Sequence, residues 1–301
     1  MSEVRYDGRV AVITGAGGGL GRSHALELAK RGAQVVVNDL GGAVDGSGSG
    51  SAAADIVVKE IQEAGGTAVA NYDSVSTPEG GEAIVQTALD NFGQVDILIN
   101  NAGILRDKSF AKMTPEEITL VLDVHLRGAF YVSQPAFRAM KDRNYGRMVH
   151  TASAAGVFGN FGQANYGAAK MGMVGLSNVL SQEGAKYNIK SNVIAPIAQT
   201  RMTTGILDQM DLDLDPRYVT SMVAYLCSEE CDFTHEIFSV GAGRFARVFI
   251  GLCQGYTNAE EGSGTLEDVR DNIEQIRNPE GYVIPANAAE EMVEAMKSLK
   301  G

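Results

Sequence analysis

Tyr166 and Lys170 are the residues of this sequence whose types and spacing most directly suggest chemistry. They lie four positions apart in the stretch 165–170. On a helix this spacing places both side chains on one face, one turn apart. A nearby ammonium charge favours the phenolate and lowers the pKa of a tyrosine, which is about 10 when unperturbed. The pair therefore predicts a general base that works near neutral pH, although packing and solvated charge alone can produce the same spacing.

The composition argues against several functional classes. The chain has 301 residues, of which 45% are hydrophobic and 21% charged, which suits one large domain or one domain with an extension. A net charge of −12 argues against nucleic acid or an anionic membrane as partner. The sequence has no run of 18 apolar residues that predicts a membrane span, and no apolar signal core at its start. Three cysteines without metal-ligand spacing, Cys227, Cys231 and Cys253, suit packing in a reducing compartment. We expect a cytoplasmic protein with no bound metal.

A glycine-rich stretch, residues 14–21, follows the first predicted strand at 10–13 and precedes a predicted helix. In this context, glycines place a pyrophosphate at the helix N-terminus, where backbone N–H groups are free. Gly15 permits the turn, Gly19 lets the backbone approach the phosphates, and Gly21 permits close helix packing. The alternative is a flexible turn without a ligand.

Acidic residues follow the next two predicted strands. Asp39 ends the strand at 35–39, about 20 residues after the glycines, where an acid can bond the adenosine ribose hydroxyls. Because a carboxylate there repels a 2′-phosphate, Asp39 favours NAD over NADP as the cofactor. The alternative is an ordinary turn residue. Asp73 follows the strand at 67–70 and either bonds the adenine amino group or caps a turn.

Alternating strands and helices predict an α/β fold, a Rossmann-like doubly wound parallel sheet of seven strands with helices on both faces. Ser153 comes directly after the fifth strand, at the sheet edge where such folds place their chemistry. One helix is expected over 114–140 and a second from Tyr166 to Tyr187. The seven strands are expected near 10–13, 35–39, 67–70, 95–100, 146–151, 191–194 and 237–240.

The remaining segments predict a lid and a C-terminal extension. The acidic, irregular stretch 197–217 is long enough to be a substrate lid. The glycine- and serine-rich stretch 41–50 is expected to be a flexible surface loop that the adenosine end of the cofactor could order. We expect one domain over 1–246, and helices near 266–276 and 287–299 in an extension over 247–301.

Taken together, these motifs resemble the short-chain dehydrogenase/reductase family. The residues that carry the resemblance are Thr14, Gly15, Gly19 and Gly21, then Asn100, Asn101, Ala102 and Gly103, and finally Ser153, Tyr166 and Lys170. Their order and spacing cover most of the first 200 residues. The resemblance implies hydride transfer between a secondary alcohol and a nicotinamide cofactor.

A narrower resemblance links the chain to the (3R)-hydroxyacyl-CoA dehydrogenase unit of peroxisomal multifunctional enzyme type 2 and its single-domain bacterial relatives. It rests on residues 39–42 with the loop that follows them, and on 124–128, 194–196, 217–219, 226–227 and 240–243. It implies a substrate that is an acyl-CoA or steroid-like molecule, and a homodimer or homotetramer. It also implies that the extension packs over an active site.

The resemblance assigns roles by position. Tyr166 takes the hydroxyl proton, Lys170 lowers its pKa and bonds the nicotinamide ribose, and Ser153 holds the substrate oxygen. His125 stands where most of the family has an Asn that holds a relay water, and it either relays the proton or packs against the Lys170 end. The expected cofactor-binding residues are Gly15, Gly18, Gly19, Leu20, Gly21, Asp39, Asp73, Ser74, Val75, Asn101, Ala102, Gly103, Tyr166, Lys170 and Pro196.

Several alternatives stay open at this point. A 17β-hydroxysteroid or other secondary alcohol is the second candidate substrate, a 3-ketoacyl carrier-protein reductase is the third possibility, and a non-catalytic nicotinamide sensor is a remote one. Pro196 precedes Ile197 where the family has Pro-Gly, so the nicotinamide-contacting turn can differ. Arg106, Lys108 and Arg201 are expected near the chemical edge of the sheet, either as contacts for CoA phosphates or as ordinary surface charges.

Overall fold

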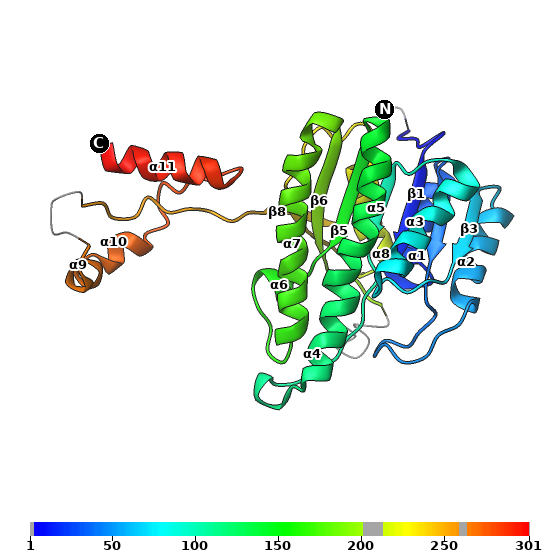
Figure 1. The fold of residues 1–301 in the computed structure, drawn as a ribbon, viewed down its shortest axis with the longest axis horizontal. Helices are drawn as coiled ribbons and strands as arrows, with labels where there is room; N and C mark the ends of the chain where they lie inside the picture. The colour runs from blue at the N-terminus through cyan, green and yellow to red at the C-terminus, as the bar shows by residue number, and fades with distance from the viewer. Residues whose placement is uncertain (1–2, 201–212, 259–263, 301) are drawn as a thin grey trace. The chain divides into compact units, whose positions relative to one another are not determined.

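An eight-stranded sheet forms the centre of the larger part of the chain (Figure 1). Its strand order is β3-β2-β1-β4-β5-β6-β7-β8, and every pair from β3 to β7 is parallel. The chain order reverses between β1 and β4, which is where doubly wound sheets open a crevice. The strands are β1 (Val10–Thr14), β2 (Gln34–Asn38), β3 (Thr67–Asn71), β4 (Ile97–Asn100), β5 (Gly146–Thr151), β6 (Ile189–Pro196), β7 (Ile237–Gly241) and β8 (Arg244–Val248).

The structure is a computed structural model that describes residues 3–200, 213–258 and 264–300. The chain divides into two compact units, Met1–Arg247 and Val248–Gly301. The first unit holds the sheet and its covering helices. The second unit begins at the last residue of β8 and, in the part that the structure describes, holds two short helices and one of 13 residues.

The eighth strand was not among the seven expected from the sequence. Ala242 and Gly243 link β7 to β8 with φ angles of 48° and 75°. Two positive φ angles in a two-residue link are typical of a type I′ hairpin turn, so β8 returns antiparallel to β7. The sequence pattern missed this strand because its side chains are mostly exposed and give no buried apolar run.

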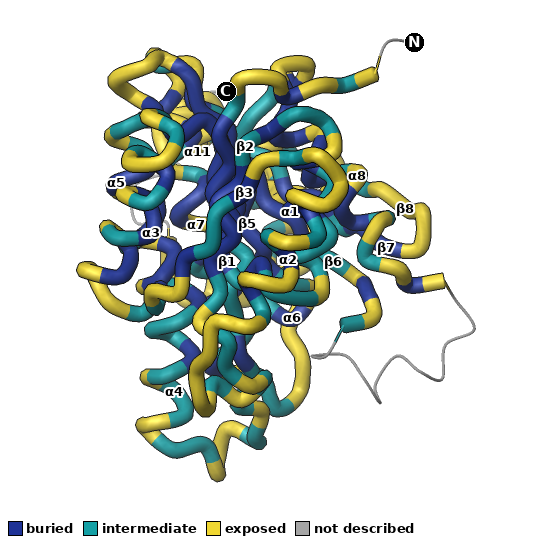
Figure 2. The backbone as a smooth tube through the Cα atoms, turned by 90° about the vertical axis from the view of Figure 1, so that its right-hand side faces the viewer, coloured by how far each residue is buried: buried dark blue, intermediate teal, exposed yellow. Residues whose placement is uncertain are grey.

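Helices cover both faces of the sheet, and the central strands are therefore buried, as Figure 2 shows in dark blue. On one face α1, α2 and α8 pack on Ala11 and Ile13 of β1. On the other face α3 and α5 pack on Val10 and Val12, while α7 packs beside β6. These helices are α1 (Gly19–Lys30), α2 (Ala52–Glu63), α3 (Pro78–Phe92), α5 (Gly128–Arg143), α7 (Ala164–Gly184) and α8 (Pro216–Cys227).

The helix expected over 114–140 is interrupted. Thr114 caps α4 (Pro115–Leu122) with a capping box that Glu117 completes. A π-helical segment, η2 (Asp123–Arg127), then joins α4 to α5. Single π turns inside helices commonly mark functional sites, because the extra residue changes which side chains face inward. Here the π turn buries His125.

The remaining elements are short, apart from the last helix. In the first unit they are η1 (Phe110–Lys112), α6 (Ala154–Val157) and η3 (Ala185–Tyr187); in the second they are α9 (Leu266–Asp271), α10 (Ile273–Arg277) and α11 (Ala288–Lys300). The single helix expected near 266–276 is thus two helices separated at Asn272. Within the second unit, Leu252 pairs with Val283, and the rings of Phe249 and Tyr282 stack at 5.2 Å between centroids.

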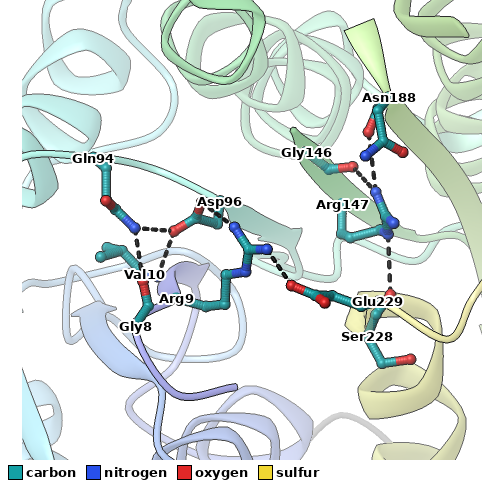
Figure 3. A network of polar contacts seen from close by, with 10 residues as sticks. All are labelled: Gly8, Arg9, Val10, Gln94, Asp96, Gly146, Arg147, Asn188, Ser228 and Glu229. Atoms are coloured by element: carbon teal, nitrogen blue, oxygen red, sulfur yellow. Dashed lines mark hydrogen bonds and ion pairs between the residues drawn. The ribbon is translucent and has the colours of Figure 1, made fainter. Parts of the chain in front are cut away.

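Charged groups form a network at the amino ends of the strands (Figure 3). Asp96, which is fully buried, accepts hydrogen bonds from the Val10 amide at 2.8 Å and from the Arg9 guanidinium at 3.2 Å. Arg9 also pairs with Glu229. Arg147 is buried on β5 and donates to the carbonyls of Gly146, Asn188 and Ser228. The network joins the starts of β1, β4, β5 and β6 to the end of α8.

The described residues contain neither a membrane-spanning helix nor a cluster of metal-ligand side chains. In residues 3–200, 213–258 and 264–300, no helix is long and apolar enough to cross a membrane. The same residues contain no group of three or more His, Cys, Asp and Glu side chains that could hold a metal ion. All three cysteines are free thiols.

Candidate active site

A cleft of about 450 Å³ opens at the carboxyl ends of β1, β2, β4, β5 and β6. Every residue assigned to the site from the sequence lines this cleft except Gly21. Gly21 lies behind the glycine turn, where a Cβ atom would collide with the carbonyl of Gly15. Gly21 therefore has the close contacts expected of its packing role and does not line the cleft.

The glycine turn brings backbone, and no bulky side chain, to the cleft. Gly15 and Gly19 have φ angles of 63° and 52°, in the left-handed region that favours glycine. A Cβ atom on Gly15 would lie 2.7 Å from the Cα of Ala102, so the turn and the end of β4 touch closely. Helix α1 starts at Gly19 with no acidic side chain in its first turn. Its free N–H groups and positive dipole end suit an anion such as a pyrophosphate.

Asp39 stands just past the carboxyl end of β2 and holds two glycine-rich segments together. Its carboxylate accepts hydrogen bonds from the amide of Gly17 at 2.8 Å and from the amide of Gly41 at 2.7 Å. Each carboxylate oxygen keeps a further acceptor position. The residue is thus both a turn organiser and a free acceptor at the cleft, so the two expectations for it are compatible.

Asp73 is held at the edge of the same cleft by two buried asparagines. Asn38 donates to its backbone carbonyl at 2.9 Å, and Asn71 donates to its carboxylate at 2.7 Å. Ser74 and Val75 line the cleft beside it. The arrangement leaves one side of the Asp73 carboxylate available to a ligand.

The segment after β4 forms the floor of the cleft. Asn101 donates from its side-chain amide to the carbonyls of Thr14 and Gly15, at 3.0 Å each. The hydroxyl of Thr14 accepts hydrogen bonds from the amides of Asn101 and Ala102. These bonds join β1 to β4 at the point where the strand order reverses. At Gly103 a Cβ atom would collide with the His125 ring, so this position requires glycine.

Ser153, Tyr166 and Lys170 come together in the cleft from two segments that are not adjacent in the sequence. Ser153 caps α6 directly after β5 and lines the cleft together with Tyr166 of α7. One turn further along α7, Lys170 donates from Nζ to the carbonyl of Thr151 at 2.6 Å. Its Nζ lies 5.5 Å from the centroid of the Tyr166 ring. The helical spacing of the pair therefore has the predicted geometry.

The structure reverses the expected direction of the Tyr166 pKa. Burial raises the pKa of Tyr166 more than the hydrogen bond with Ser153 lowers it. Burial also lowers the pKa of Lys170 to about 7. Since Lys170 is itself desolvated, it loses charge near neutral pH and contributes less to stabilising a phenolate than the helical spacing alone suggested.

His125 is buried and anchored to the backbone of Ile104. Its Nε2 lies 3.0 Å from the Ile104 nitrogen and 2.8 Å from the Ile104 oxygen, and its ring meets the Tyr166 ring edge-on at 5.1 Å. Burial and the nearby Lys170 charge lower the pKa of His125 well below its ordinary value. A neutral ring that packs and orients its neighbours is what these contacts favour, over a group that gains and loses a proton.

The cleft also has walls that the sequence did not predict. Val44 accepts a backbone hydrogen bond from Leu105 at 3.0 Å, so the loop expected to be flexible crosses to the segment after β4. Leu120 and Val124 reach the cleft from the interrupted helix. No local pattern marks these contacts, because they join segments about 60 to 80 residues apart. The additional lining residues are Asn38, Leu40, Gly42, Ala43, Val44, Gly46, Ile104, Leu105, Leu120, Val124, Thr151, Ala152, Ser76, Asn160, Gln163, Ala198 and Thr200.

The expected lid and cationic residues have mixed outcomes. Pro196 lines the cleft at the end of β6, but residues 201–212 of the expected lid, including Arg201, lie outside the described residues. Lys108 pairs with Glu117 at 2.6 Å, and Arg106 approaches Asp45 at 3.8 Å. Neither Arg106 nor Lys108 lines the cleft.

Comparison with known proteins gives close matches. The family model for short chain dehydrogenases matches residues 9–211. A short-chain type dehydrogenase/reductase of Mycobacterium tuberculosis is 57% identical over 241 residues, which are 80% of this chain and 84% of that protein. Peroxisomal multifunctional enzyme A of Dictyostelium discoideum is 51% identical over 288 residues, which are 95% of this chain and 64% of that protein.

A solved structure also matches over nearly the whole chain. Full-length peroxisomal multifunctional enzyme type 2 of Drosophila melanogaster superposes with a TM-score of 0.83 and 40% sequence identity, covering 99% of this chain and 50% of that one. The chain thus spans less than two thirds of the length of the multifunctional relatives that it matches.

Proposed function

The chain belongs to the short-chain dehydrogenase family, and from this membership we propose that it is an NAD-dependent (3R)-hydroxyacyl-CoA dehydrogenase. Proteins of this family are oxidoreductases that act on a CH–OH group. The observation that carries the proposal is the meeting of Ser153, Tyr166 and Lys170 beside the glycine turn and Asp39 in one cleft. A hydroxyl-binding group, a proton-transferring phenol and a dinucleotide cradle are the parts that this reaction needs.

The residues at the cleft fit a dinucleotide. Gly15 and Gly19 bring backbone to within reach of a pyrophosphate at the start of α1, and Asp39 offers carboxylate acceptors to a ribose. A negative charge at Asp39 disfavours the 2′-phosphate of NADP, which supports NAD. The chemistry that a bound nicotinamide would supply is acceptance of the hydride from the carbinol carbon.

The chain itself handles the proton and the oxygen. Ser153 donates a hydrogen bond to the substrate oxygen and so stabilises negative charge that develops there. Tyr166 exchanges the proton with that oxygen. Because burial raises its pKa, Tyr166 is a phenol at neutral pH, ready to protonate a ketone, and becomes a base for the alcohol as the pH rises. Lys170, held by the Thr151 carbonyl, keeps its Nζ beside the Tyr166 ring.

The substrate class follows from the relatives and from the cleft wall. The matched proteins include multifunctional enzymes of peroxisomes, of which this chain corresponds to one part. Ile104, Leu105, Leu120 and Val124 form an apolar wall at the cleft. Such a wall suits the hydrocarbon part of an acyl chain next to the reacting carbinol.

A substrate panel tests the proposal. The protein is mixed with NAD and with (3R)- and (3S)-3-hydroxyacyl-CoAs of several chain lengths, 17β-hydroxysteroids and simple secondary alcohols, and NADH absorbance is followed. We expect turnover with the (3R)-hydroxyacyl-CoAs and little with their (3S) counterparts. Preference for a hydroxysteroid would replace the proposed substrate, and no turnover with any alcohol would contradict the enzymatic role.

A further inference from the structure

Asn165 precedes Tyr166 at the start of α7, and its side chain is only 3% exposed. It uses both ends of its amide. Its Nδ2 donates to the carbonyl of Arg106 at 3.1 Å and to the carbonyl of Glu117 at 3.1 Å. Its Oδ1 accepts from the backbone amide of Tyr166 at 2.7 Å. One buried side chain therefore joins three segments of backbone.

Those three segments surround the reacting position. Arg106 belongs to the stretch that follows the cleft floor, directly after Ile104 and Leu105. Glu117 lies in α4, three residues before Leu120 of the apolar wall. Tyr166 carries the phenol itself. We infer that Asn165 is a positioning residue, which sets the place of Tyr166 relative to the floor and wall of the cleft through these three hydrogen bonds.

The start of α7 explains why such a residue is needed. The first backbone N–H groups of a helix have no partner within the helix. Gln163, at the N-cap, makes no side-chain hydrogen bond to them. The Tyr166 amide lies in this first turn, and Asn165 supplies its acceptor. The first turn of α7 is thus held by contacts to other segments, while Lys170 and later residues are held by packing in the helix body.

The consequence for the reaction is one of geometry. Proton transfer and hydride loss require the phenol, the carbinol and the cofactor to align within about 1 Å, and a misplacement of that size can cost about 100-fold in rate. Without the Asn165 amide, two carbonyls and one N–H each lose a hydrogen bond, and the first turn of α7 can shift. Asp39 and the glycine turn belong to other segments, so cofactor binding should be little affected.

The inference rests on the proposed function of Tyr166, and the experiment separates the two. Asn165→Ala should lower kcat by about ten- to a hundredfold, while KM for NAD stays within about twofold. The matched control is Asn192→Ala. Asn192, in the middle of β6, is also buried, at 1% exposed, and it bonds the Phe233 carbonyl and the Glu236 amide in the segment before β7. The control should lose stability to a similar degree and keep kcat within about twofold.

Two results would overturn the inference. One is a folded Asn165→Ala protein with unchanged kcat; the other is an equal loss of kcat in Asn192→Ala, which would make the effect one of general stability. If Asn165→Ala does not fold, Asn165→Asp is measured in its place. This variant keeps the size of the side chain and the acceptor for the Tyr166 amide, but it removes the two donated hydrogen bonds. It should show the same loss of kcat, and an unchanged kcat would contradict the positioning role. Tyr166→Phe is measured in parallel, because retained turnover in that variant would contradict the proposed function as well as the inference.

Discussion

The two edges of the sheet use polar groups in opposite ways. At the amino edge, Arg9 pairs with both Asp96 and Glu229, and Arg147 donates to three carbonyls (Figure 3). At the carboxyl edge, Lys170 is as deeply buried as Arg147, yet among the described residues it makes no ion pair and donates to one carbonyl. Several hydrogen bonds or an ion partner offset the cost of burying a charge, whereas a buried cation with one carbonyl partner costs stability and has a shifted pKa.

This difference separates a stabilising edge from a reactive one on a single sheet. Both edges consist of strand ends and loops, so the element type does not distinguish them. The two edges differ in the groups that surround their buried charged side chains. Buried Asp96 has a cation beside it, whereas Lys170 has an aromatic ring and a carbonyl. We expect removal of a paired group at the amino edge to lower stability, and removal of a reactive group at the carboxyl edge to lower turnover.

The largest expected effect is at the reactive edge. Tyr166→Phe removes the proton-transferring hydroxyl and should lower turnover by about 10²- to 10⁴-fold. NADH binding, followed by fluorescence titration, should stay close to that of the unchanged protein. The matched control is Tyr145→Phe at the amino edge, whose buried hydroxyl has no partner among the described residues and whose loss should leave turnover intact. If Tyr166→Phe kept turnover within tenfold of that of the original protein, the carboxyl edge could not be called the reactive one.

A substitution at the amino edge should lower stability and leave turnover intact. Asp96→Ala leaves the Val10 amide without its acceptor and Arg9 with fewer partners. We expect a loss of about 3 kcal/mol in the free energy of unfolding, measured by urea denaturation at pH 7. Turnover of the folded variant should stay within twofold, since the network lies at the other end of the strands. A selective loss of turnover in fully folded protein would contradict this separation.

Lys170 should make the folding stability of the protein depend on pH. Its folded pKa of about 7 lies below the unfolded value of 10.5, so the unfolded chain binds more protons between these pH values. Stability from this group therefore rises with pH from about 7 to 10.5. Lys170→Met should be more stable relative to the original protein at pH 7 than at pH 9.5.

We expect that relative advantage to shrink by at least about 1.4 kcal/mol, the free energy of one pKa unit. Urea denaturation of both proteins at the two pH values measures it. Arg147→Met, at the other edge, should show no such change over this range because arginine stays charged. A constant difference for Lys170→Met would mean that the lysine is charged in the folded protein.

The smallest expected effect concerns cofactor choice. Asp39→Ala removes the charge that repels a 2′-phosphate and should raise the ratio of kcat/KM for NADP to that for NAD by about tenfold. The value for NAD should fall as well, because Gly17 and Gly41 lose their acceptor. Asp45→Ala, in the same loop but not lining the cleft, is the control and should leave the ratio unchanged. An unaltered ratio in Asp39→Ala would leave that residue with a turn-forming role only.

Much of the fold was predictable from local sequence. Buried apolar strands, the glycine turn and the Thr114 cap each carry their signal within a few residues. The doubly wound class was predicted and is confirmed by the sheet order and by the match to a solved structure. The exposed strand β8, the π turn at His125 and the division of the 266–276 helix were missed, because none of them alters the apolar pattern from which elements are predicted.

The candidate site also combines features that the local sequence predicts with features that it does not. The sequence by itself determined the reactive residue types, the four-residue spacing of Tyr166 and Lys170, and the acid after β2, since each is encoded by neighbours in the chain. Only the tertiary structure decided the charge states and the positions. Burial, which no local pattern specifies, raises the pKa of Tyr166 and lowers that of Lys170. Asn165 acquires its contacts from segments about 50 to 60 residues away, so its place became visible only in the folded chain.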